Sequence, residues 1–343
     1  MPFPWANTIL LALLLAQLLT GFVGLISGAM DRSWALWLHG VGAYGIAVVL
    51  FWKARVVLNS LEHRRRAAYA RAVFLVMAGM LLLTLGTGLL WSFAGRRYVG
   101  GFSLITIHIV LAVAVGTLLV YHVATMRFVL RIPDAVGRRA FLRLGSVAVA
   151  GLILSQLAAG GMALLRLPGA RRRFTGSYET GSLTGELPVV IWLSDLVPAL
   201  SADTYRLTIE GLVDRPFTLT HADLVQASRD RQTVILDCTG GWYSEQEWTG
   251  VRVGRLLEKA GVQAGARSVL FQSATGYWRR YPVEEARNCL LATAVGGSAL
   301  DAGHGYPARL VAERRRGFEW VKWVVLIRAD AEPPLAQPPL PLQ

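Results

Sequence analysis

The chain has 343 residues, 54% of them apolar, and 35 basic residues outnumber 22 acidic ones to give a formal net charge of +13. The apolar share exceeds the ~45–50% of an ordinary soluble domain, and the long apolar runs all lie within residues 1–166. Much of the basic surplus lies in loops between these runs, where charge orients a membrane protein, so it does not indicate nucleic-acid binding. With only Cys238 and Cys289, a disulfide framework is excluded. The sequence predicts a membrane half followed by a globular half.

Five apolar stretches are long enough to cross a bilayer, which takes about 20 helical residues. The loops at 53–71 and 127–143 are strongly basic, whereas the alternate loops are short. Because basic loops stay in the cytoplasm, we expect a multi-pass inner-membrane protein surrounded by lipid. Its N-terminus would be cytoplasmic, and the chain after residue 165 would be extracytoplasmic. The five stretches lie near residues 8–28, 34–52, 72–93, 103–126 and 144–165.

The segment "GRRAFLRLGSVAVAGL", residues 137–152, has the form of a twin-arginine export signal. Arg138 and Arg139 precede Phe141, Leu142 and a stretch of small apolar residues. Such signals normally stand at an N-terminus, and here the pair falls at the cytoplasmic end of the predicted fifth span. The alternative is an ordinary basic anchor that follows the positive-inside rule.

Two histidines, His39 and His108, fall near the outer ends of the second and fourth predicted spans. Imidazoles inside a membrane are costly and usually functional, and haem iron takes axial histidines from facing helices. The pair therefore predicts one b-type haem near the outer surface. Gly40, Gly42 and Gly45 would let the macrocycle approach the second span. The alternative is that both histidines only bond to neighbouring helices.

A second haem is a weaker prediction and would use His122, which lies on the fourth span toward the cytoplasm. At the matching depth on the second span stands Lys53, and the spare histidine, His63, lies in the basic loop. In helix count and spaced histidines, residues 8–126 resemble the cytochrome b and ferric-reductase-like membrane domains.

The sequence of the second half predicts strands joined by short helices. "YRLTIEGLVDRPFTLTHADL", residues 205–224, predicts a strand, a turn at 214–216 and a helix after Thr220. A buried strand at 233–236 ends at Asp237 and Cys238 before a Gly-Gly turn, and a helix over 253–260 closes at Gly261. Further strands are expected in residues 268–277, 306–312 and 321–329. The fold class expected is an all-α membrane bundle followed by an α+β domain.

Motifs in this half occur in one order along the chain: "LTIEGLVDRP", "DCTGGW" with "WTGV", "SATGY", "HGYPARLV" and "GFEWVKWVVLI". On these motifs, residues 186–330 resemble the sulfite-oxidase-type molybdopterin domain. Because little follows residue 330, the dimerisation domain of eukaryotic sulfite oxidases is not expected. The closer likeness is to the bacterial periplasmic branch that includes methionine sulfoxide reductases. The domains expected are 1–130 (haem-binding), 131–170 (export-like segment, fifth helix and linker), 171–330 (molybdopterin-binding) and 331–343 (Pro-rich tail).

The resemblance makes Cys238 the catalytic molybdenum ligand. Thiolates are soft ligands for redox metals, although a lone cysteine is more often a small buried hydrophobe, as we expect for Cys289. The residues expected to hold the pterin are Ser273, His304, Arg309, Lys322, and Trp320 and Val321 through their backbone amides. For Arg309 and Lys322 the alternative is a solvated strand end.

The substrate mouth is expected to involve aromatic and basic side chains, with residues 189–195 close to the cofactor. Arg279 and Arg280 would attract an oxyanion such as sulfite or else lie on the surface. The mouth candidates are Trp242, Tyr243, Tyr277, Arg279 and Arg280.

The function expected is a membrane-anchored molybdenum oxidoreductase whose haem exchanges electrons with the quinone pool. We expect two-electron reduction of a sulfoxide or N-oxide. A sulfite-type dehydrogenase and a non-catalytic electron-transfer or binding protein are the alternatives. No nucleotide fingerprint is present, so a direct nicotinamide donor is not expected. A domain that acquires its cofactor in the cytoplasm must cross the membrane folded, which would explain an export signal in mid-chain.

Overall fold

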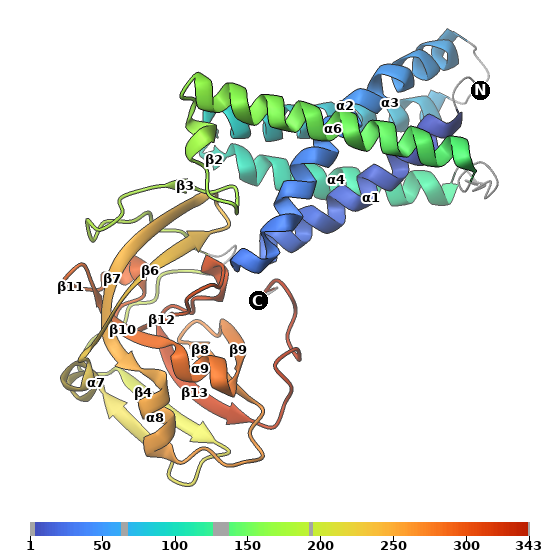
Figure 1. The fold of residues 1–343 in the computed structure, drawn as a ribbon. Helices are drawn as coiled ribbons and strands as arrows, with labels where there is room; N and C mark the ends of the chain where they lie inside the picture. Colours follow the sequence, from blue (N-terminus) through green and yellow to red (C-terminus); the bar gives the residue numbers. More distant parts are fainter. Residues whose placement is uncertain (1–3, 63–67, 126–136, 192–194, 342–343) are drawn as a thin grey trace. The chain divides into compact units, whose positions relative to one another are not determined.

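The computed structural model describes residues 4–62, 68–125, 137–191 and 195–341. It divides into two compact units, which meet along the chain at residues 178 and 179, apart from a short segment at 26–29 that groups with the second unit. The first unit is helical and the second is built on sheets (Figure 1). The predicted order, a helical region followed by a mixed sheet-and-helix domain, is confirmed.

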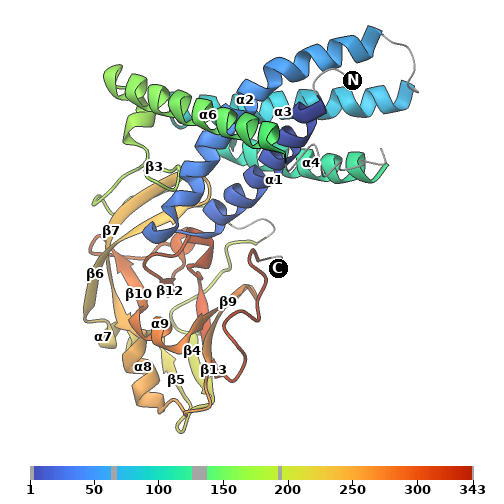
Figure 2. The same ribbon diagram turned by 45° about the vertical axis from the view of Figure 1, so that its right-hand side comes forward.

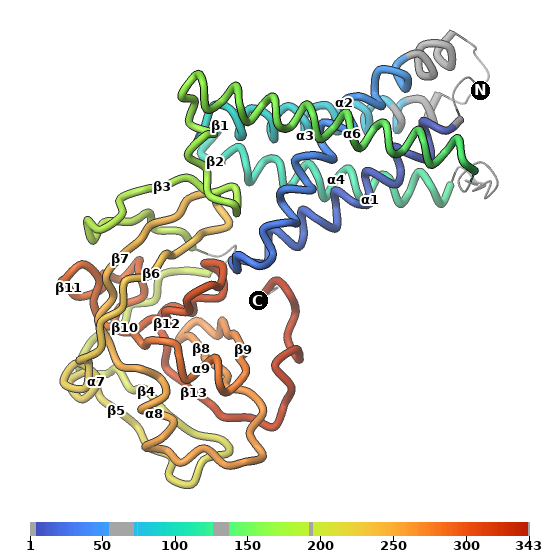
Figure 3. Tube along the Cα trace, viewed as in Figure 1, coloured from blue at the N-terminus to red at the C-terminus, as the bar shows by residue number. Residues whose placement is uncertain are grey.

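The first unit contains five described helices that are long and apolar enough to cross a membrane. Each coincides with one of the predicted apolar stretches, and all five are followed easily in the tube of Figure 3. The elements are α1 (Pro4–Ile26), η1 (Met30–Arg32), α2 (Ser33–Glu62), α3 (Ala68–Ala94), the short strands β1 (Tyr98–Val99) and β2 (Phe102–Ser103), α4 (Leu104–Thr125) and α6 (Arg138–Leu164).

The two basic loops are shorter than predicted. Helix α2 continues through the charged residues to Glu62 and α3 begins at Ala68, so much of the predicted loop at 53–71 is helical. Likewise α6 begins at Arg138, which places the twin arginines in its first turn. Arginine, lysine and glutamate are good helix formers, so a charged run ends an apolar span without ending the helix.

Helix packing in this unit uses small residues. Helix α2 packs against α6 and α4 packs against α3. At the first contact a Cβ on Gly151 would lie 2.7 Å from the Val41 carbonyl oxygen, so only glycine allows this approach. After α6, the turn η2 (Pro168–Arg171) leads into a linker that returns to α3, where Trp91 Nε1 donates to Gly176 O at 2.9 Å and Tyr178 Oη donates to Trp91 O at 2.6 Å.

The second unit contains two sheets that share one apolar core (Figure 2). The first has the order β11-β10-β7-β3, with β6 also paired with β7 and β12 with β10. The second has the order β5-β4-β13-β8-β9, in which β13 runs parallel to β4 and the other pairs are antiparallel. The strands are β3 (Tyr178–Glu179), β4 (Arg206–Gly211), β5 (Phe217–Thr220), β6 (Asp230–Cys238), β7 (Trp242–Arg252), β8 (Ser268–Ser273), β9 (Trp278–Pro282), β10 (Leu290–Val295), β11 (Ser298–Ala299), β12 (Arg309–Val311) and β13 (Val324–Asp330).

Short helices begin and end at the predicted signals. Helix α7 (His221–Ala227) starts with a capping box in which Thr220 and Asp223 bond to each other's backbone amides. Helix α8 (Val253–Ala260) ends at Gly261, whose φ of +70° favours glycine. The remaining elements are α9 (Val283–Asn288), η3 (Ala302–His304) and η4 (Gly317–Glu319).

The Pro-rich tail is fastened to the edge strand β9. The Gln337 side chain accepts from the Arg280 amide at 2.9 Å and donates to the Arg280 carbonyl at 2.8 Å. Arg279 Nη1 donates to Pro338 O at 3.0 Å. The tail thereby satisfies backbone groups that an edge strand otherwise leaves open to pairing with another chain.

Candidate active site

A cavity lies where β6 and β8 end, beside the first residue of β12 and the turns η3 and η4. Of the seven residues predicted around the cofactor, Val321 is absent from the lining, because its side chain is fully buried in the core. The six that line the cavity are Cys238, Ser273, His304, Arg309, Trp320 and Lys322.

Cys238 is the last residue of β6, and a tight turn follows it at once. The Gly240 amide donates to Cys238 Sγ at 3.4 Å, and the Gly241 amide donates to Cys238 O at 3.1 Å. Gly241 has a φ of +86°, which explains a glycine at this point of the turn. Burial raises the pKa of the Cys238 thiol, against the effect of the Gly240 hydrogen bond and the nearby Arg316. Cys289, in contrast, is buried in the core as expected.

Two cations line the same cavity without a carboxylate partner among the described residues. Arg309 is 2% exposed; its Nη1 donates to His304 O at 3.1 Å, and its Nε has no hydrogen-bond partner there. Lys322 Nζ donates only to carbonyls, of Val190 at 3.0 Å and Gly303 at 2.5 Å. Burial lowers the pKa of Arg309 to about 10 and that of Lys322 to about 7. Cations that are removed from water in this way are normally paired with an anion.

The Arg309 guanidinium also lies over two indole rings. Its central carbon is 5.0 Å from the Trp248 ring centre and 5.7 Å from that of Trp320. The Trp320 amide donates to Gly317 O within η4, so Trp320 contributes its ring to the site and not the predicted amide. Flat aromatic faces hold a guanidinium in place without neutralising it.

The His304 ring is already fully engaged by the protein. Its Nδ1 lies 2.8 Å from Asp301 Oδ2, and its Nε2 lies 2.9 Å from Leu187 O. Partial burial would raise the pKa of Asp301, but the hydrogen bonds from His304 outweigh it and the pKa is lowered. His304 therefore connects the segment around Leu187 to η3. The backbone carbonyl oxygen of His304 also accepts the hydrogen bond that orients Arg309. His304 stays a prediction as a cofactor-binding residue, with both ring nitrogens already bonded within the protein.

Ser273 and the 189–195 segment complete the wall. Ser273 Oγ lies 3.0 Å from Thr275 Oγ1, which in turn lies 3.1 Å from Asp195 Oδ2. Val190, Ile191 and Asp195 line the cavity, while residues 192–194 lie outside the described residues. Asp195 thus places a carboxylate on the cavity wall.

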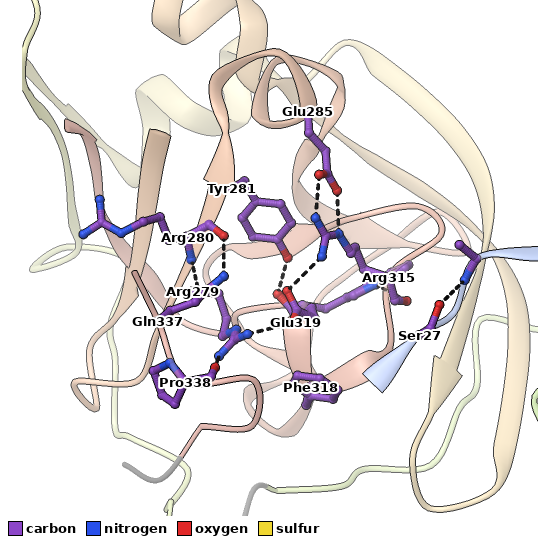
Figure 4. A network of polar contacts seen from close by, with 12 residues as sticks. Ser27, Arg279, Arg280, Tyr281, Glu285, Arg315, Phe318, Glu319, Gln337 and Pro338 are labelled. Atoms are coloured by element: carbon purple, nitrogen blue, oxygen red, sulfur yellow. Dashed lines mark hydrogen bonds and ion pairs between the residues drawn. The ribbon is translucent and has the colours of Figure 1, made fainter. Parts of the chain in front are cut away.

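Among the mouth candidates, Trp242 and Tyr277 line the cavity and Tyr243 does not. Both expectations for Arg279 and Arg280 are wrong, since neither residue lines the cavity or lies on the surface. Arg279 Nη2 donates to Glu319 Oε1 at 2.7 Å (Figure 4). Arg280 Nη1 donates to Asp330 Oδ2 at 2.7 Å and to Ser268 Oγ at 2.9 Å. Consecutive strand residues point to opposite faces, and here each face supplies an acidic partner.

Some residues around the site were not predicted as site residues, although several of them lie within the recognised motifs. Thr239, Phe318 and Trp323 line the cavity, and the buried pair Asp237 and Arg316 lies directly behind Cys238. A charged residue at the end of a buried strand was the signal for Asp237. Arg316 was hidden in the run Arg314–Arg316, which looks like an exposed basic turn.

The first unit holds a second candidate site, made by the two predicted histidines. The rings of His39 on α2 and His108 on α4 lie with their centres 6.1 Å apart and their planes at 78°. Each Nδ1 bonds to the backbone of the adjacent helix: His39 to Gln17 O at 3.2 Å and His108 to Thr84 O at 2.9 Å. No hydrogen bond to either Nε2 comes from the described residues.

The two histidines rest in equivalent cradles. Four residues after each accepting carbonyl stands a glycine, Gly21 on α1 and Gly88 on α3. A Cβ there would lie 3.0 Å from His39 Cε1 and 2.9 Å from His108 Cε1, respectively. A threonine hydroxyl precedes each glycine and lies within 3.5 Å of the histidine Nδ1. The helix pairs α1–α2 and α3–α4 therefore present their histidines in the same way.

The glycines predicted to admit a macrocycle have different neighbours. The Gln17 side chain fills the space at Gly42, and Val147 and Leu13 approach Gly45, whereas Gly40 has open space. The second haem stays a prediction: His122 is half-buried near the end of α4, and its candidate partner His63 lies outside the described residues. Lys53 Nζ donates to Asn7 Oδ1 at 2.5 Å.

Residues 194–337 match the family model described as the oxidoreductase molybdopterin binding domain. The chain is 29% identical over 192 residues to the NADPH nitrate reductase of Beauveria bassiana, covering 46% of this chain and 21% of that protein. It is 32% identical over 123 residues to the uncharacterized oxidoreductase YuiH of Bacillus subtilis, covering 35% and 62%. The chain therefore spans less than two thirds of each of these relatives.

Among solved structures, the sulfane dehydrogenase SoxCD from Paracoccus pantotrophus matches with 31% identity and a TM-score of 0.38 over 40% of each chain. The resemblance drawn from the motifs is confirmed for the second unit by the family model and the curated relatives. The match over residues 194–337 is therefore to an oxidoreductase molybdopterin-binding domain, and the relatives that the chain resembles are themselves named oxidoreductases or reductases.

Proposed function

We propose that this chain is a membrane-anchored reductase that uses a molybdenum cofactor at Cys238 to reduce a neutral sulfoxide or N-oxide, with electrons from quinol passing through one b-type haem. The observation that carries the proposal is the meeting of one thiol and two uncompensated cations in a single cavity. Cys238, Arg309 and Lys322 all line it.

The residues present fit the molybdenum cofactor. Arg309 Nε is an orphaned buried donor, and Lys322 has only carbonyl partners, so an anionic pterin phosphate would supply the missing counter-charge. The Cys238 thiolate is the soft ligand that molybdenum requires. When bound, the cofactor would supply two-electron oxygen-atom transfer. The protein holds the thiolate with the Gly240 amide and keeps Arg309 oriented between Trp248 and Trp320.

The charges around the cavity favour a neutral substrate. Arg279 and Arg280 are both consumed in buried ion pairs, so they offer nothing to an oxyanion. With Arg309 and Lys322 assigned to the cofactor, Asp195 is the remaining charged side chain on the described wall. A carboxylate repels sulfite and nitrate but not a sulfoxide. The reaction takes two electrons and two protons from a quinol and gives a sulfide, or an amine, and one water.

The histidine pair supports a haem in the helical unit. A histidine–metal bond is about 2 Å long, so two imidazoles that share one iron have their ring centres about 6 Å apart. The observed separation is 6.1 Å. The carbonyls of Gln17 and Thr84 hold each Nδ1, which leaves Nε2 for iron and fixes the ring orientation.

Membrane insertion is supported by the exterior of the five helices, which is apolar around the unit. Large exposed hydrophobic side chains occur on every one of these helices, among them Leu19, Phe51, Leu82, Val120 and Leu157. The basic segments of the sequence support a topology with the N-terminus in the cytoplasm and the molybdopterin domain outside. In this arrangement Arg138 and Arg139 would act as the export signal for a domain that is already folded and loaded.

The test is turnover of detergent-purified full-length protein, with a quinol as electron donor for methionine sulfoxide, trimethylamine N-oxide and nitrate, and with a quinone as electron acceptor for sulfite. We expect turnover with the two neutral compounds, and loss of that turnover to background in the Cys238→Ser variant. Oxidation of sulfite in preference to reduction of either neutral compound would contradict the proposed direction and favour the sulfite-type dehydrogenase.

The Asp195→Asn variant tests the charge argument separately. Removing the carboxylate should lower the apparent KM for anions such as nitrate or sulfite while leaving the KM for methionine sulfoxide within about twofold, because the attraction or repulsion of one charge acts mainly on charged ligands. Equal changes for charged and neutral compounds would show that Asp195 has only a structural role.

A further inference from the structure

The peptide that carries Cys238 is held from behind by a buried ion pair. Arg316 Nη1 donates to Asp237 Oδ1, and Arg316 Nη2 donates to Cys238 O at 3.2 Å. The two charged residues are 3% and 3% exposed. One guanidinium therefore grips two consecutive residues at the end of β6.

The same contact joins Cys238 to another wall of the cavity. Residues 237 and 316 also form a parallel β-bridge, and a Cβ on Gly317 would lie 3.3 Å from Cys238 Cα. Arg316 is the N-cap of η4, which brings Phe318 to the cavity, with Trp320 directly after it. Arg316 therefore fixes the position of Cys238 relative to Phe318 and Trp320.

Stability alone is a weak explanation for this pair. A buried ion pair is often no more stabilising than apolar residues of the same size, because both charges lose their hydration. Asp237 directly precedes Cys238, and the pair is buried behind the cavity wall, where the low dielectric strengthens any charge. A charge pair at that place acts on whatever the thiol binds.

We propose that Arg316 and Asp237 are positioning residues that fix the Cys238 thiolate and set the reduction potential of the metal bound to it, with opposite signs. This inference rests on the proposed molybdenum site. Reduction adds negative charge to the metal centre, which the Arg316 cation favours and the Asp237 carboxylate opposes. The intact pair balances these two effects while its hydrogen bonds keep the Cys238 peptide in place.

The experiment is a redox titration of purified full-length holoprotein, followed by the Mo(V) signal in electron paramagnetic resonance, with molybdenum per chain measured alongside. Asp237→Asn keeps the shape and leaves the cation unbalanced, so the midpoint potential should rise. Arg316→Met leaves the carboxylate unbalanced, so the potential should fall. The double variant should return toward the wild-type value.

Two further variants separate position from charge. Arg316→Lys keeps the cation but loses the forked grip, so the potential should stay near wild type while molybdenum retention falls about 10- to 100-fold, as for other residues that orient metal ligands. Asp330→Asn is the matched control, because it breaks the buried pair with Arg280 in the same domain. It should leave both potential and metal content unchanged.

Shifts in the same direction for Asp237→Asn and Arg316→Met, or no shift beyond that of Asp330→Asn, would overturn the inference. If thermal unfolding shows that the Arg316→Met variant is not folded, the Asp237→Asn variant alone decides. An unchanged midpoint potential in Asp237→Asn then overturns the inference. If purified wild-type protein contains no molybdenum, that result refutes the proposed function, and this inference with it.

Discussion

The ammonium group of Lys322 is hydrogen-bonded only to neutral carbonyl groups among the described residues, so a bound anion would stabilise its positive charge. Burial lowers the pKa of Lys322 from 10.5 to about 7. Arg309 adds a second buried cation whose charge further lowers the pKa of Lys322. The negative charge of a bound pterin phosphate would raise the pKa of Lys322 again.

The stability of the cofactor-free protein should therefore rise as pH increases from about 7 toward 9; above that range the raised pKa values of Cys238 and Cys289 oppose the effect, because the unfolded chain loses these protons first. In that window the unfolded chain binds a proton at Lys322 that the folded protein does not, so raising the pH favours the folded state. We expect thermal unfolding of protein made without molybdenum cofactor to show this slope.

The Lys322→Met variant should lose the slope, and Lys259→Met, which removes an exposed lysine, should keep it. A wild-type stability that is flat or falls over this pH range would contradict the assignment of Lys322 as a buried, unneutralised cation.

At the residue level, chemistry-bearing motifs were predictable and hydrogen-bond partners were not. Cys238, Arg309 and Lys322 stand in motifs that place them near one another, and the structure brings them to one cavity. Arg279 and Arg280 look identical in sequence to surface or substrate-binding cations. Their burial depends on Glu319 and Asp330, which lie some 40 and 50 residues away along the chain. Pairings over that distance have no local signature.

Elements were predictable wherever their apolar pattern matched their burial. Strand β7 alternates between buried and half-buried residues along most of its length, yet its inward positions include Ser244, Gln246 and Gly250. The apolar alternation that identifies a strand is therefore missing. Helix α8 shows the opposite case, with an apolar face and a glycine stop that gave both of its ends correctly.

The glycine cradles give a prediction at the level of helices. Gly88→Ala should reduce bound haem at least tenfold, because its methyl group would lie 2.9 Å from the His108 ring and displace it. Gly86→Ala is the matched control on the same helix, since open space surrounds that position. Haem per chain is measured from the pyridine haemochrome spectrum of purified protein. Equal haem loss in both variants, or none in Gly88→Ala, would refute the cradle.

For the whole molecule, the mid-chain arginine pair is the feature on which the proposed export of the second unit depends. Arg138 and Arg139 are exposed in the first turn of α6. Replacing both by lysine keeps the charge, so an ordinary positive-inside anchor should be unaffected. An export signal that requires arginine should fail.

We therefore expect Arg138→Lys with Arg139→Lys to leave the helices in the membrane while molybdenum-loaded domain is lost from the extracytoplasmic side. Protease accessibility in spheroplasts, together with molybdenum content, measures both. Arg143→Lys, which lies one turn further along α6, is the control and should export normally. Normal export of the molybdenum-loaded domain in the double variant would show that the two arginines act only as a basic anchor.

The measurement that tests the account most directly is a count of molybdenum and iron per chain in detergent-purified full-length protein. Cys238 with its two cations predicts close to one molybdenum, and the single histidine pair at 6.1 Å predicts close to one iron. Iron without molybdenum, in a host that makes the cofactor, would contradict the assignment of the cavity. Molybdenum without iron would contradict the haem and the electron route from quinol.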